Sequence, residues 1–377
     1  MRWDEDADWA SSVRRRLLVW YEREKRELPW REDRDPYRIL VSEMMLVQTT
    51  VAAVVPHFER FLRLYPDFAA LARAEEDEVV KAWEGLGYYR RARQLHAAAQ
   101  TIVEKHGGRM PDDPDAVRAL PGVGRYLAGA ILSQAFDRPE PILEANSQRV
   151  LARLLAWRGE IAATATKKRL WEAAERLVPE SRAGDFNQSL MELGALVCSP
   201  RSPRCLVCPL SARCEARKLG LQDELPRIAP RPAPLSVEEA CAVVVREGRA
   251  LLMVRRKSEG LWGGFWEFPT IHREGADPAG RSFGEPVDLA EGVRRLTGIE
   301  VEIRDPAKTL AYGVTRHRVR LYAHKALALS GEPRPGPGLS EVRWVEPAAL
   351  ADLTLGSAAR RLASAIEAAP GDWGLSS

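Results

Sequence analysis

The sequence lacks the features that place a protein in a membrane or outside the cell. It contains no run of about 18 apolar residues that would predict a transmembrane helix. Its first residues, MRWDEDADW, are acidic and polar, unlike a secretory signal peptide. Only five of its 377 residues are cysteines, and in a reducing compartment we expect thiols or metal ligands rather than disulfides. The sequence therefore predicts a soluble, cytoplasmic protein.

The chain also lacks a strong excess of charge of either sign. Its 56 Lys and Arg residues nearly balance its 53 Asp and Glu residues, which leaves a net charge of +3. A nucleic acid would therefore be bound by local basic patches and not by the overall field of the protein. Apolar residues make up 45% of the chain, and its length suffices for two or three domains with ordinary cores.

A glycine-containing turn interrupts a helical pattern at LPGVGR (120–125). Glycine adopts the left-handed angles of a tight turn and lets backbone N–H groups approach a ligand. A helix is predicted to follow over 126–136, and the N-terminus of a helix favours an anion. The pattern predicts that Gly122, Val123 and Gly124 hold a phosphate of a nucleic acid backbone. The alternative is a glycine C-cap between two packed helices.

Two glutamates stand at positions that favour chemistry. Glu144 lies in PILEAN, after an apolar run and before a predicted amphipathic helix, where a helix start favours its charge. Glu43 is the one charge in VSEMMLVQTTVAAVV, which is predicted to be part of a buried helix over 39–55. Burial would raise the pKa of Glu43 into the range of a general acid. The alternative is a glutamate that caps the helix or pairs with Arg38.

Four of the cysteines form a C-x6-C-x2-C-x5-C pattern, namely Cys198, Cys205, Cys208 and Cys214. Four thiolates at such spacing can hold either tetrahedral zinc or a [4Fe–4S] cluster. Zinc ribbons usually present two C-x2-C knuckles, and this segment has one, which favours the cluster. Cys241 stands apart in a Val-rich stretch and is predicted to be a core residue.

The composition changes after a proline-rich segment. Residues 222–237, QDELPRIAPRPAPLSV, carry four prolines and are predicted to be a semi-rigid linker. A helical domain is expected over 8–221, and a second domain of strands and helices over 238–368. In the second domain the pattern predicts a helix near 288–297, strands within 308–329 and a helix that ends near Ala368.

The turn followed by a single carboxylate resembles the helix-hairpin-helix DNA glycosylase superfamily. The segments SEMMLVQTTVAAVVPHFERF and WEGLGYYRRARQLHAAA resemble MutY-type adenine DNA glycosylases, and the cysteine spacing is similar to the cluster loop of endonuclease III and MutY relatives. The resemblance implies an all-α helix-hairpin-helix glycosylase domain with a four-cysteine iron–sulfur loop, followed by an α+β Nudix-like domain. It further implies a bacterial, monomeric base excision repair enzyme that binds double-stranded DNA. Its substrate would be adenine mispaired with 8-oxoguanine or guanine.

The resemblance assigns catalytic roles to four residues. Glu43 would protonate the adenine, and Glu144 stands where the family has the Asp that stabilises the sugar cation. Tyr126 occupies the position of the Lys that attacks the sugar in bifunctional relatives, and a phenol cannot form a Schiff base. We therefore expect a monofunctional enzyme in which Tyr126 and Asn146 hydrogen-bond the carboxylate of Glu144.

The resemblance also implies which residues bind DNA in the helical domain. Gln48 would reach into the base stack, and Tyr88 would wedge into the duplex beside the damaged guanine. Leu86 is expected to contact the DNA as well. Arg90 and Arg91 follow this aromatic residue and could bind phosphates. The alternative for these arginines is a solvated helix face.

The second domain is expected to read 8-oxoguanine and not to hydrolyse nucleotides. Nudix hydrolases hold Mg²⁺ with carboxylates on one helix, but the corresponding AEGVRRLTGI has Gly292, Arg295 and Leu296 at those positions. A family loop that reads 8-oxoguanine matches Val314-Thr315-Arg316, with Thr315 and Arg316 as contacts. A register with His317 as the reading residue is the alternative, as is an ordinary strand with exposed basic residues.

Glu144 is one methylene longer than the family Asp, and a misplacement of about 1 Å can cost ~100-fold in rate. Two other functions therefore stay open from the sequence. One is a damage-binding protein that does not release the base. The other is a glycosylase of the same fold that acts on another mismatched base, such as thymine or uracil, although excision of a pyrimidine needs no N7 protonation by Glu43.

Overall fold

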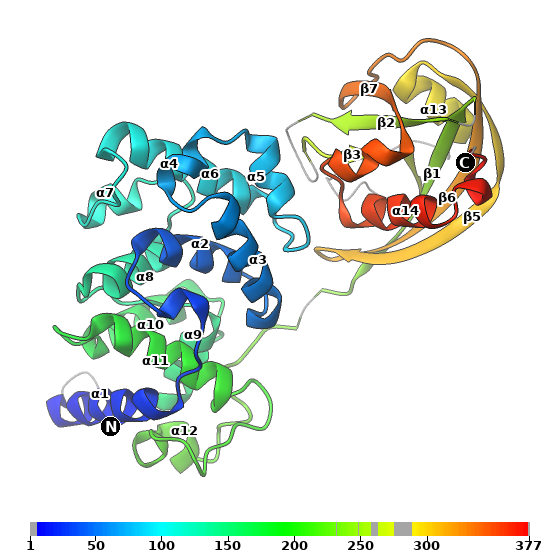
Figure 1. Cartoon of the computed structure of the whole chain (residues 1–377). Coiled ribbons are helices and arrows are strands. Elements are labelled where there is room, and N and C mark those ends of the chain that lie inside the picture. Colours follow the sequence, from blue (N-terminus) through cyan, green and yellow to red (C-terminus); the bar gives the residue numbers. More distant parts are fainter. Residues whose placement is uncertain (1–5, 231, 248, 258–262, 275–288, 376–377) are drawn as a thin grey trace. The chain divides into compact units, whose positions relative to one another are not determined.

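The computed structural model describes residues 6–230, 232–247, 249–257, 263–274 and 289–375. The chain divides into two compact units, Met1–Pro230 and Arg231–Ser377 (Figure 1). No helix in the described part of the chain is both long and apolar enough to cross a lipid bilayer.

The first unit is helical. Its helices are α1 (Ala7–Glu24), α2 (Pro36–Leu46), α3 (Val51–Leu64), α4 (Phe68–Arg73), α5 (Glu76–Ala82), α6 (Arg90–His106), α7 (Pro114–Arg118), α8 (Arg125–Phe136), α9 (Ala145–Leu154), α10 (Thr164–Leu177), α11 (Ala183–Leu196) and α12 (Glu215–Lys218). Aspartates cap several of them: Asp6 accepts a hydrogen bond from Trp9 N at 2.8 Å, and Asp67 accepts one from Ala70 N at 2.7 Å. Such caps fix where a helix begins because they satisfy N–H groups that lack a partner within the helix.

The single helix expected over 39–55 is in fact two helices. α2 ends at Leu46, α3 begins at Val51, and Gln48 between them adopts a φ of 58°. The hydroxyl of Thr50 caps α3 by accepting a hydrogen bond from Ala53 N at 3.4 Å. The prediction was wrong because the apolar run contains a polar Gln-Thr-Thr turn, and a threonine hydroxyl competes with the helix for backbone groups.

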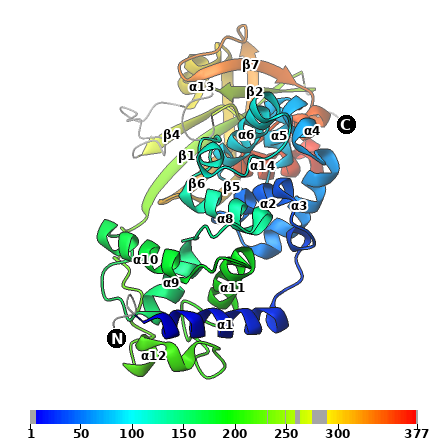
Figure 2. The same cartoon turned by 90° about the vertical axis from the view of Figure 1, so that its left-hand side faces the viewer.

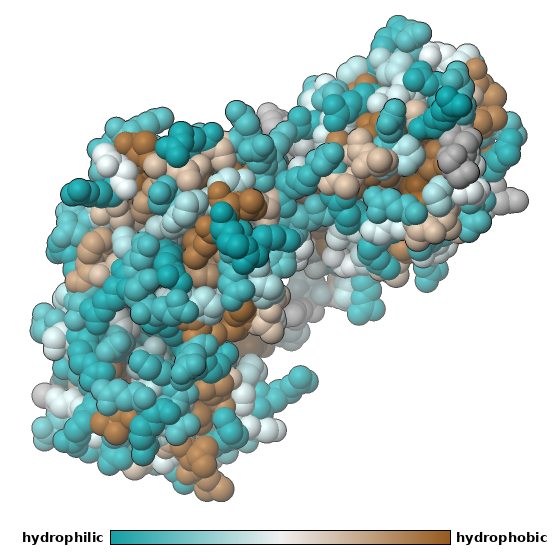
Figure 3. Space-filling model, viewed as in Figure 1, coloured by the Kyte–Doolittle hydropathy of each residue, from teal (hydrophilic) through white to brown (hydrophobic). Residues whose placement is uncertain are grey.

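Two groups of helices meet inside this unit (Figures 1 and 2). α1, α9, α10 and α11 share a core that includes Leu17, Leu151 and Phe186. α2 packs on α3, α6 and α8, and α8 in turn packs on α11. Hydrophilic residues cover most of the face of this unit that Figure 3 shows, with smaller apolar patches between them. The glycine-containing turn lies between α7 and α8, so it precedes a helix that touches both groups.

The second unit is a seven-stranded sheet with a helix on each face. Its elements are β1 (Leu235–Arg246), β2 (Ala250–Arg256), β3 (Trp266–Glu267), β4 (Thr270–Glu274), α13 (Leu289–Thr297), β5 (Glu300–Val314), β6 (His317–Ser330), β7 (Leu339–Val345) and α14 (Ser357–Ala368). The strand order is β3-β2-β1-β6-β5, with β4 paired to β1 and β7 to β2. β1 and β6 run parallel, and the other pairs run antiparallel.

β1 is the central strand and is buried on both faces. Cys241 and Val243 pack in the core beneath α14, and Ala242 and Val244 pack in the core beneath α13. A strand that is covered on both faces reads as a continuous apolar run, which explains the sequence ACAVVV. Cys241 is a core residue, as expected, with 1% exposed.

The expected linker is shorter than its proline content indicated. β1 begins at Leu235, inside the segment 222–237, and Arg227 O accepts a hydrogen bond from Ile161 N at 2.9 Å. The start of the segment therefore lies against the helical unit and its end belongs to the sheet. Leu235 N also donates to Arg316 O at 2.9 Å, which extends the sheet into this segment.

Candidate active site

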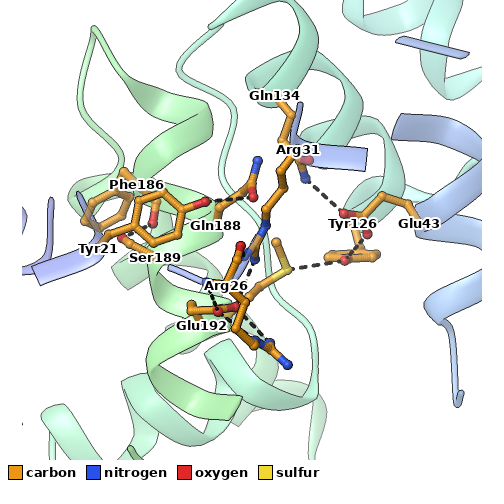
Figure 4. A network of polar contacts seen from close by, with 11 residues as sticks. Tyr21, Arg26, Arg31, Glu43, Tyr126, Gln134, Phe186, Gln188, Ser189 and Glu192 are labelled. Atoms are coloured by element: carbon orange, nitrogen blue, oxygen red, sulfur yellow. Dashed lines mark hydrogen bonds and ion pairs between the residues drawn. The ribbon is translucent and has the colours of Figure 1, made fainter. Parts of the chain in front are cut away.

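Glu43 is buried inside the helical unit, with only 4% of it exposed. It lies in the last turn of α2, where Tyr126 Oη donates to Glu43 Oε2 at 2.5 Å and Gln134 Nε2 donates to Oε1 at 2.9 Å (Figure 4). Burial raises the pKa of Glu43 more than these two hydrogen bonds lower it, and the negative charge of Glu144 raises it further. The site therefore favours a protonated Glu43 at a pH where an exposed glutamate is ionised.

Tyr126 contacts Glu43, whereas a contact with Glu144 was expected. Its hydroxyl also lies 3.6 Å from Met191 Sδ, and burial raises its pKa well above the ordinary value. The phenol can thus donate to an ionised Glu43, or accept from a protonated Glu43 while it donates to the sulfur. The expectation was wrong because the partner is decided by the packing of α8 on α2. Arg38, the other partner considered for Glu43, pairs with two exposed carboxylates instead.

Glu144 is the N-cap of α9. Its Oε1 accepts from Ser147 N at 2.7 Å, and its Oε2 accepts from Asn146 N at 2.8 Å and from Asn146 Nδ2 at 3.2 Å. The expected contact between Asn146 and this carboxylate is therefore present. Burial raises the pKa of Glu144, and the backbone N–H groups of Asn146 and Ser147 oppose that rise. These hydrogen bonds hold the Glu144 carboxylate against the start of α9.

One cavity of about 860 Å³ collects the predicted catalytic residues and one predicted DNA contact. Its lining includes Glu43, Gln48, Tyr126, Glu144 and Asn146. Two carboxylates that face one cavity repel each other, so the pair holds a proton more readily than either would alone. Glu43 is the more favourable site for that proton, because Glu144 accepts hydrogen bonds from backbone N–H groups at a helix N-terminus, where negative charge is favoured.

A buried ion pair lies at the same cavity, and no sequence pattern indicated it. Glu192 of α11 is 1% exposed and accepts from Arg26 Nε at 2.7 Å, from Arg26 Nη2 at 2.9 Å and from Arg31 Nη2 at 2.9 Å (Figure 4). Burial alone would raise the pKa of Glu192, but these hydrogen bonds outweigh it and lower the pKa to about 2. Leu28 and Trp30 also line the cavity. Both come from the segment Leu-Pro-Trp-Arg (28–31) between α1 and α2.

The glycine-containing turn has the geometry that the sequence predicted. Gly122 has a φ of 75°, and a Cβ built on it would lie 2.7 Å from Gln94 Cβ. Gly124 is exposed and is the N-cap of α8. Val123 serves differently from the expectation, because its side chain is buried and its N–H donates to Leu120 O at 3.1 Å. It anchors the turn, while the backbone at the two glycines faces solvent.

The two residues expected to enter the duplex are both exposed and both lie on turns. Tyr88 is 52% exposed with a φ of 49°, and Gln48 is exposed with a φ of 58°. Arg90, at the start of α6, is exposed as well. The expectation for Leu86 was wrong, since its side chain is 5% exposed and packs inside the unit.

The expectation that Arg91 binds a phosphate was also wrong, because its side chain is buried. Only 8% of it is exposed, and its Nη1 donates to Met44 O at 2.5 Å and to Met45 O at 2.9 Å. Its Nη2 donates to Gly87 O at 3.1 Å. A basic run on a helix looks uniform in sequence, but α6 turns one of its arginines inward.

Comparisons with known proteins agree with this geometry. Residues 41–176 match the HhH-GPD superfamily of base excision DNA repair proteins, and residues 240–365 match the NUDIX domain family. The chain is 34% identical to the adenine DNA glycosylase of Schizosaccharomyces pombe over 317 residues, which cover 68% of this chain and 69% of that protein. It is 32% identical to the adenine DNA glycosylase of Buchnera aphidicola subsp. Schizaphis graminum, with 68% of this chain and 74% of that protein covered. This chain belongs to the adenine DNA glycosylase family.

Mammalian members of the adenine DNA glycosylase family are longer. The chain is 37% identical to the adenine DNA glycosylase of Rattus norvegicus over 316 residues, which cover 70% of this chain and 61% of that relative. It therefore spans about three fifths of the length of this relative. Among solved structures, a thermostable thymine-DNA glycosylase superposes with a TM-score of 0.52 at 33% identity and covers 56% of this chain and 98% of that one. The overlap supports the glycosylase fold of the helical unit.

In this adenine DNA glycosylase family member the four spaced cysteines converge. Cys198, Cys205, Cys208 and Cys214 line a cavity of about 30 Å³ beside α12. Arg153, which is 2% exposed, donates to Cys198 Sγ at 3.3 Å. Among the residues that the structure describes, no three His, Cys, Asp or Glu side chains are arranged around a single metal ion. The four thiols that line this cavity are donors of the kind that zinc or an iron–sulfur cluster takes.

The segment expected to read 8-oxoguanine is the turn between β5 and β6. Thr315 has a φ of 51°, and Thr315 and Arg316 are both exposed at its tip. His317 is 8% exposed, and its Nδ1 lies 3.4 Å from Thr315 Oγ1. The alternative register, in which His317 makes the contact, is therefore not supported, because its side chain is turned into the unit.

The helix that would carry Nudix catalysis is α13, and its packing leaves no room for the missing carboxylate. A Cβ on Gly292 would lie 2.7 Å from Ile271 Cγ2 of β4. Glu291, the one acidic residue in the first turn, is exposed and paired with Arg294 at 2.8 Å. At Gly292, α13 therefore packs closely on β4.

Proposed function

We propose that this protein is a monofunctional adenine DNA glycosylase that removes adenine mispaired with 8-oxoguanine or guanine from double-stranded DNA. The observation that carries the proposal is that a buried carboxylate, Glu43, and a partly buried one, Glu144, line one cavity beside a helix-hairpin-helix turn. Glu43 favours the protonated form, and Glu144 accepts hydrogen bonds at a helix N-terminus. Hydrolysis of a glycosidic bond uses one carboxylic acid and one carboxylate in this way.

The reaction begins when the adenine is extruded from the helix into the cavity, at a cost of a few kcal/mol that protein contacts offset. Glu43 then transfers its proton to N7 of the adenine and makes the base a neutral leaving group. Tyr126 accompanies this change, because its hydroxyl can return to donating toward Glu43 as the carboxylate forms. Gln134 holds the other oxygen of Glu43 throughout.

Loss of the base leaves positive charge on the sugar. Glu144 stabilises that charge as a carboxylate, or traps it, and its orientation is fixed by Asn146 and Ser147. Glu43, now ionised, acts as the base that activates water. Because residue 126 is a tyrosine, no amine is available at that position to form a Schiff base and cleave the strand.

The remaining parts support binding. We propose that the exposed backbone at Gly122 and Gly124 binds a phosphate and that the exposed side chains of Gln48 and Tyr88 enter the duplex. In the second unit, Thr315 and Arg316 are the proposed contacts to 8-oxoguanine, and the Gly292 contact argues against nucleotide hydrolysis.

We propose that the four cysteines hold a [4Fe–4S] cluster, which would organise the loop that contains them. Arg149 connects this loop to the site: it donates to Cys198 O at 2.8 Å and to Asn146 Oδ1 at 2.8 Å. The protein side of this arrangement is structural. It fixes the amide that orients Glu144.

The first test is single-turnover release of adenine from a duplex with A opposite 8-oxoguanine, followed by alkaline cleavage at the abasic site. The native protein is compared with Glu43→Gln and Glu144→Asp, and with a duplex that carries a T·G mispair. Release by the native protein that is lost in Glu43→Gln supports the proposal. If only Glu144→Asp releases adenine, the native chain binds damage without cutting. Release of thymine in place of adenine would assign the other substrate.

A further inference from the structure

Two exposed turns of the helical unit share an unusual backbone conformation. Gln48, between α2 and α3, and Tyr88, before α6, both lie in the left-handed region with φ of 58° and 49°. This region costs a residue with a side chain about 1–2 kcal/mol, so each turn needs support from its surroundings. Gln48 and Tyr88 are 40 residues apart in the sequence.

Arg91 is the side chain that supports both turns. On the Gln48 side, it donates to Met44 O at 2.5 Å, to Met45 O at 2.9 Å and to Thr49 Oγ1 at 3.4 Å. On the Tyr88 side, it donates to Leu86 O at 3.3 Å and Gly87 O at 3.1 Å. These five contacts are shared by Nη1 and Nη2 of one guanidinium group.

The contacts match what the two turns lack. Met44 and Met45 lie in the last turn of α2, whose carbonyls have no partner within the helix and carry the negative end of the helix dipole. A buried guanidinium there donates hydrogen bonds to the carbonyls and places a positive charge at the negative end of the helix dipole. It stays charged, because burial lowers the pKa of Arg91 only to about 10. The guanidinium also lies 5.5 Å from the ring centroids of Trp83 and Tyr88. It therefore orients the Tyr88 ring as well as the backbone before it.

We propose that Arg91 is a positioning residue that holds the Gln48 turn and the Tyr88 turn in a fixed relation, so that both side chains enter the duplex as one preorganised unit. The inference rests on the proposed function. Arg91 itself does not touch DNA. Its planar fork of donors reaches carbonyls of two segments at once, which the single ammonium of a lysine cannot reproduce.

The test is Arg91→Lys in single-turnover adenine release from the A·8-oxoguanine duplex. We expect a loss of roughly 10- to 100-fold, the equivalent of one or two hydrogen bonds to a charged group. Arg60→Lys is the control for the loss of an arginine that donates to a backbone carbonyl elsewhere, because the exposed Arg60 donates through Nη2 to Ala82 O at 2.9 Å and to neither turn. If Arg91→Lys fails to fold, Thr49→Val takes its place. It removes only the longest of the five contacts, at 3.4 Å, and should lower the rate of adenine release about two- to fivefold.

A double-mutant cycle separates positioning from a general loss of structure. In a background with Gln48→Ala and Tyr88→Ala, no entering side chains are left to position. Adding Arg91→Lys to this background should therefore lower the rate of adenine release by less than about threefold. A cost that remains 10- to 100-fold in this background overturns the proposal.

The same cycle is measured by affinity for a duplex with 2′-fluoro-2′-deoxyadenosine opposite 8-oxoguanine, in which the fluorine suppresses cleavage. This arm does not depend on catalysis. If the native protein releases no base from any duplex, the proposed activity fails, while coupling in the affinities still supports the role of Arg91. If activity is present but the affinities and rates are additive, the role of Arg91 is refuted and the activity stands.

Discussion

Replacing Tyr126 by phenylalanine tests the arrangement around Glu43 directly. The change removes the hydroxyl that donates to Glu43 Oε2 at 2.5 Å and leaves the Gln134 contact and the volume of the ring in place. Burial raises the pKa of Glu43 and this hydrogen bond lowers it. Without the hydroxyl, the pKa of Glu43 rises further, and a larger fraction of Glu43 is protonated at a given pH.

The size of the effect follows from the hydrogen bond that is lost. A hydrogen bond to a charged group contributes about 1.5–3 kcal/mol, but the protonated form of Glu43 also uses the hydroxyl as a partner. The difference between the two forms is then about 1 kcal/mol, and 1.36 kcal/mol corresponds to one pH unit. The alkaline limb of adenine release, where Glu43 loses its proton, should move to higher pH by roughly half to one unit.

The assay is the pH profile of single-turnover adenine release for the native protein and Tyr126→Phe. Tyr21→Phe is the matched control, because Tyr21 Oη donates to Gln188 Oε1 at 2.9 Å and does not contact Glu43. It should leave the alkaline limb in place. An alkaline limb that stays fixed, or moves to lower pH, in Tyr126→Phe would refute the assignment of that limb to Glu43.

Three other changes probe the remaining parts. Glu192→Gln leaves two arginine charges without their carboxylate and should lower the free energy of unfolding in urea at pH 7 by about 3–5 kcal/mol. Because the folded pKa of Glu192 is about 2, the stability of the native protein should fall as the pH drops from about 4.5 to 2, and it should fall less in the variant. Gly122→Ala forces a left-handed alanine against Gln94, so affinity for duplex DNA should drop about tenfold or more. Cys208→Ala should abolish stoichiometric iron and acid-labile sulfide, whereas Cys241→Ala, in the core of β1, should leave both unchanged.

Each of these has an outcome that would contradict it. For Glu192, it is a variant as stable as the native protein at pH 7, since the ion pair would then contribute nothing. Gly108 also has a positive φ, of 77°, but a Cβ on it would meet no atom within 4 Å. Equal losses of affinity in Gly108→Ala and Gly122→Ala would mean that the glycine-containing turn has no special role in DNA binding. One zinc per chain with no sulfide would replace the cluster by a single metal ion.

Local features of this protein were determined by its sequence. The positive φ of Gly122 and the start of α8 at Arg125 follow from the conformational freedom of glycine and the short range of capping. The missing Nudix carboxylates were also readable, because a residue type is visible in the sequence whatever its surroundings. The burial of β1 followed from an unbroken run of apolar residues, which fits a strand covered on both faces.

Contacts between distant segments were decided only by the tertiary structure. Tyr126 meets Glu43, 83 residues away, because α8 packs on α2. Glu192 joins Arg26 and Arg31 across more than 160 residues, and no spacing rule connects positions that far apart. Arg91 looks like its exposed neighbour Arg90 in the sequence, but the fold turns it toward unpaired carbonyls. The physical reason is that backbone preferences act over a few residues, whereas burial and electrostatic pairing depend on which surfaces the folded chain brings together.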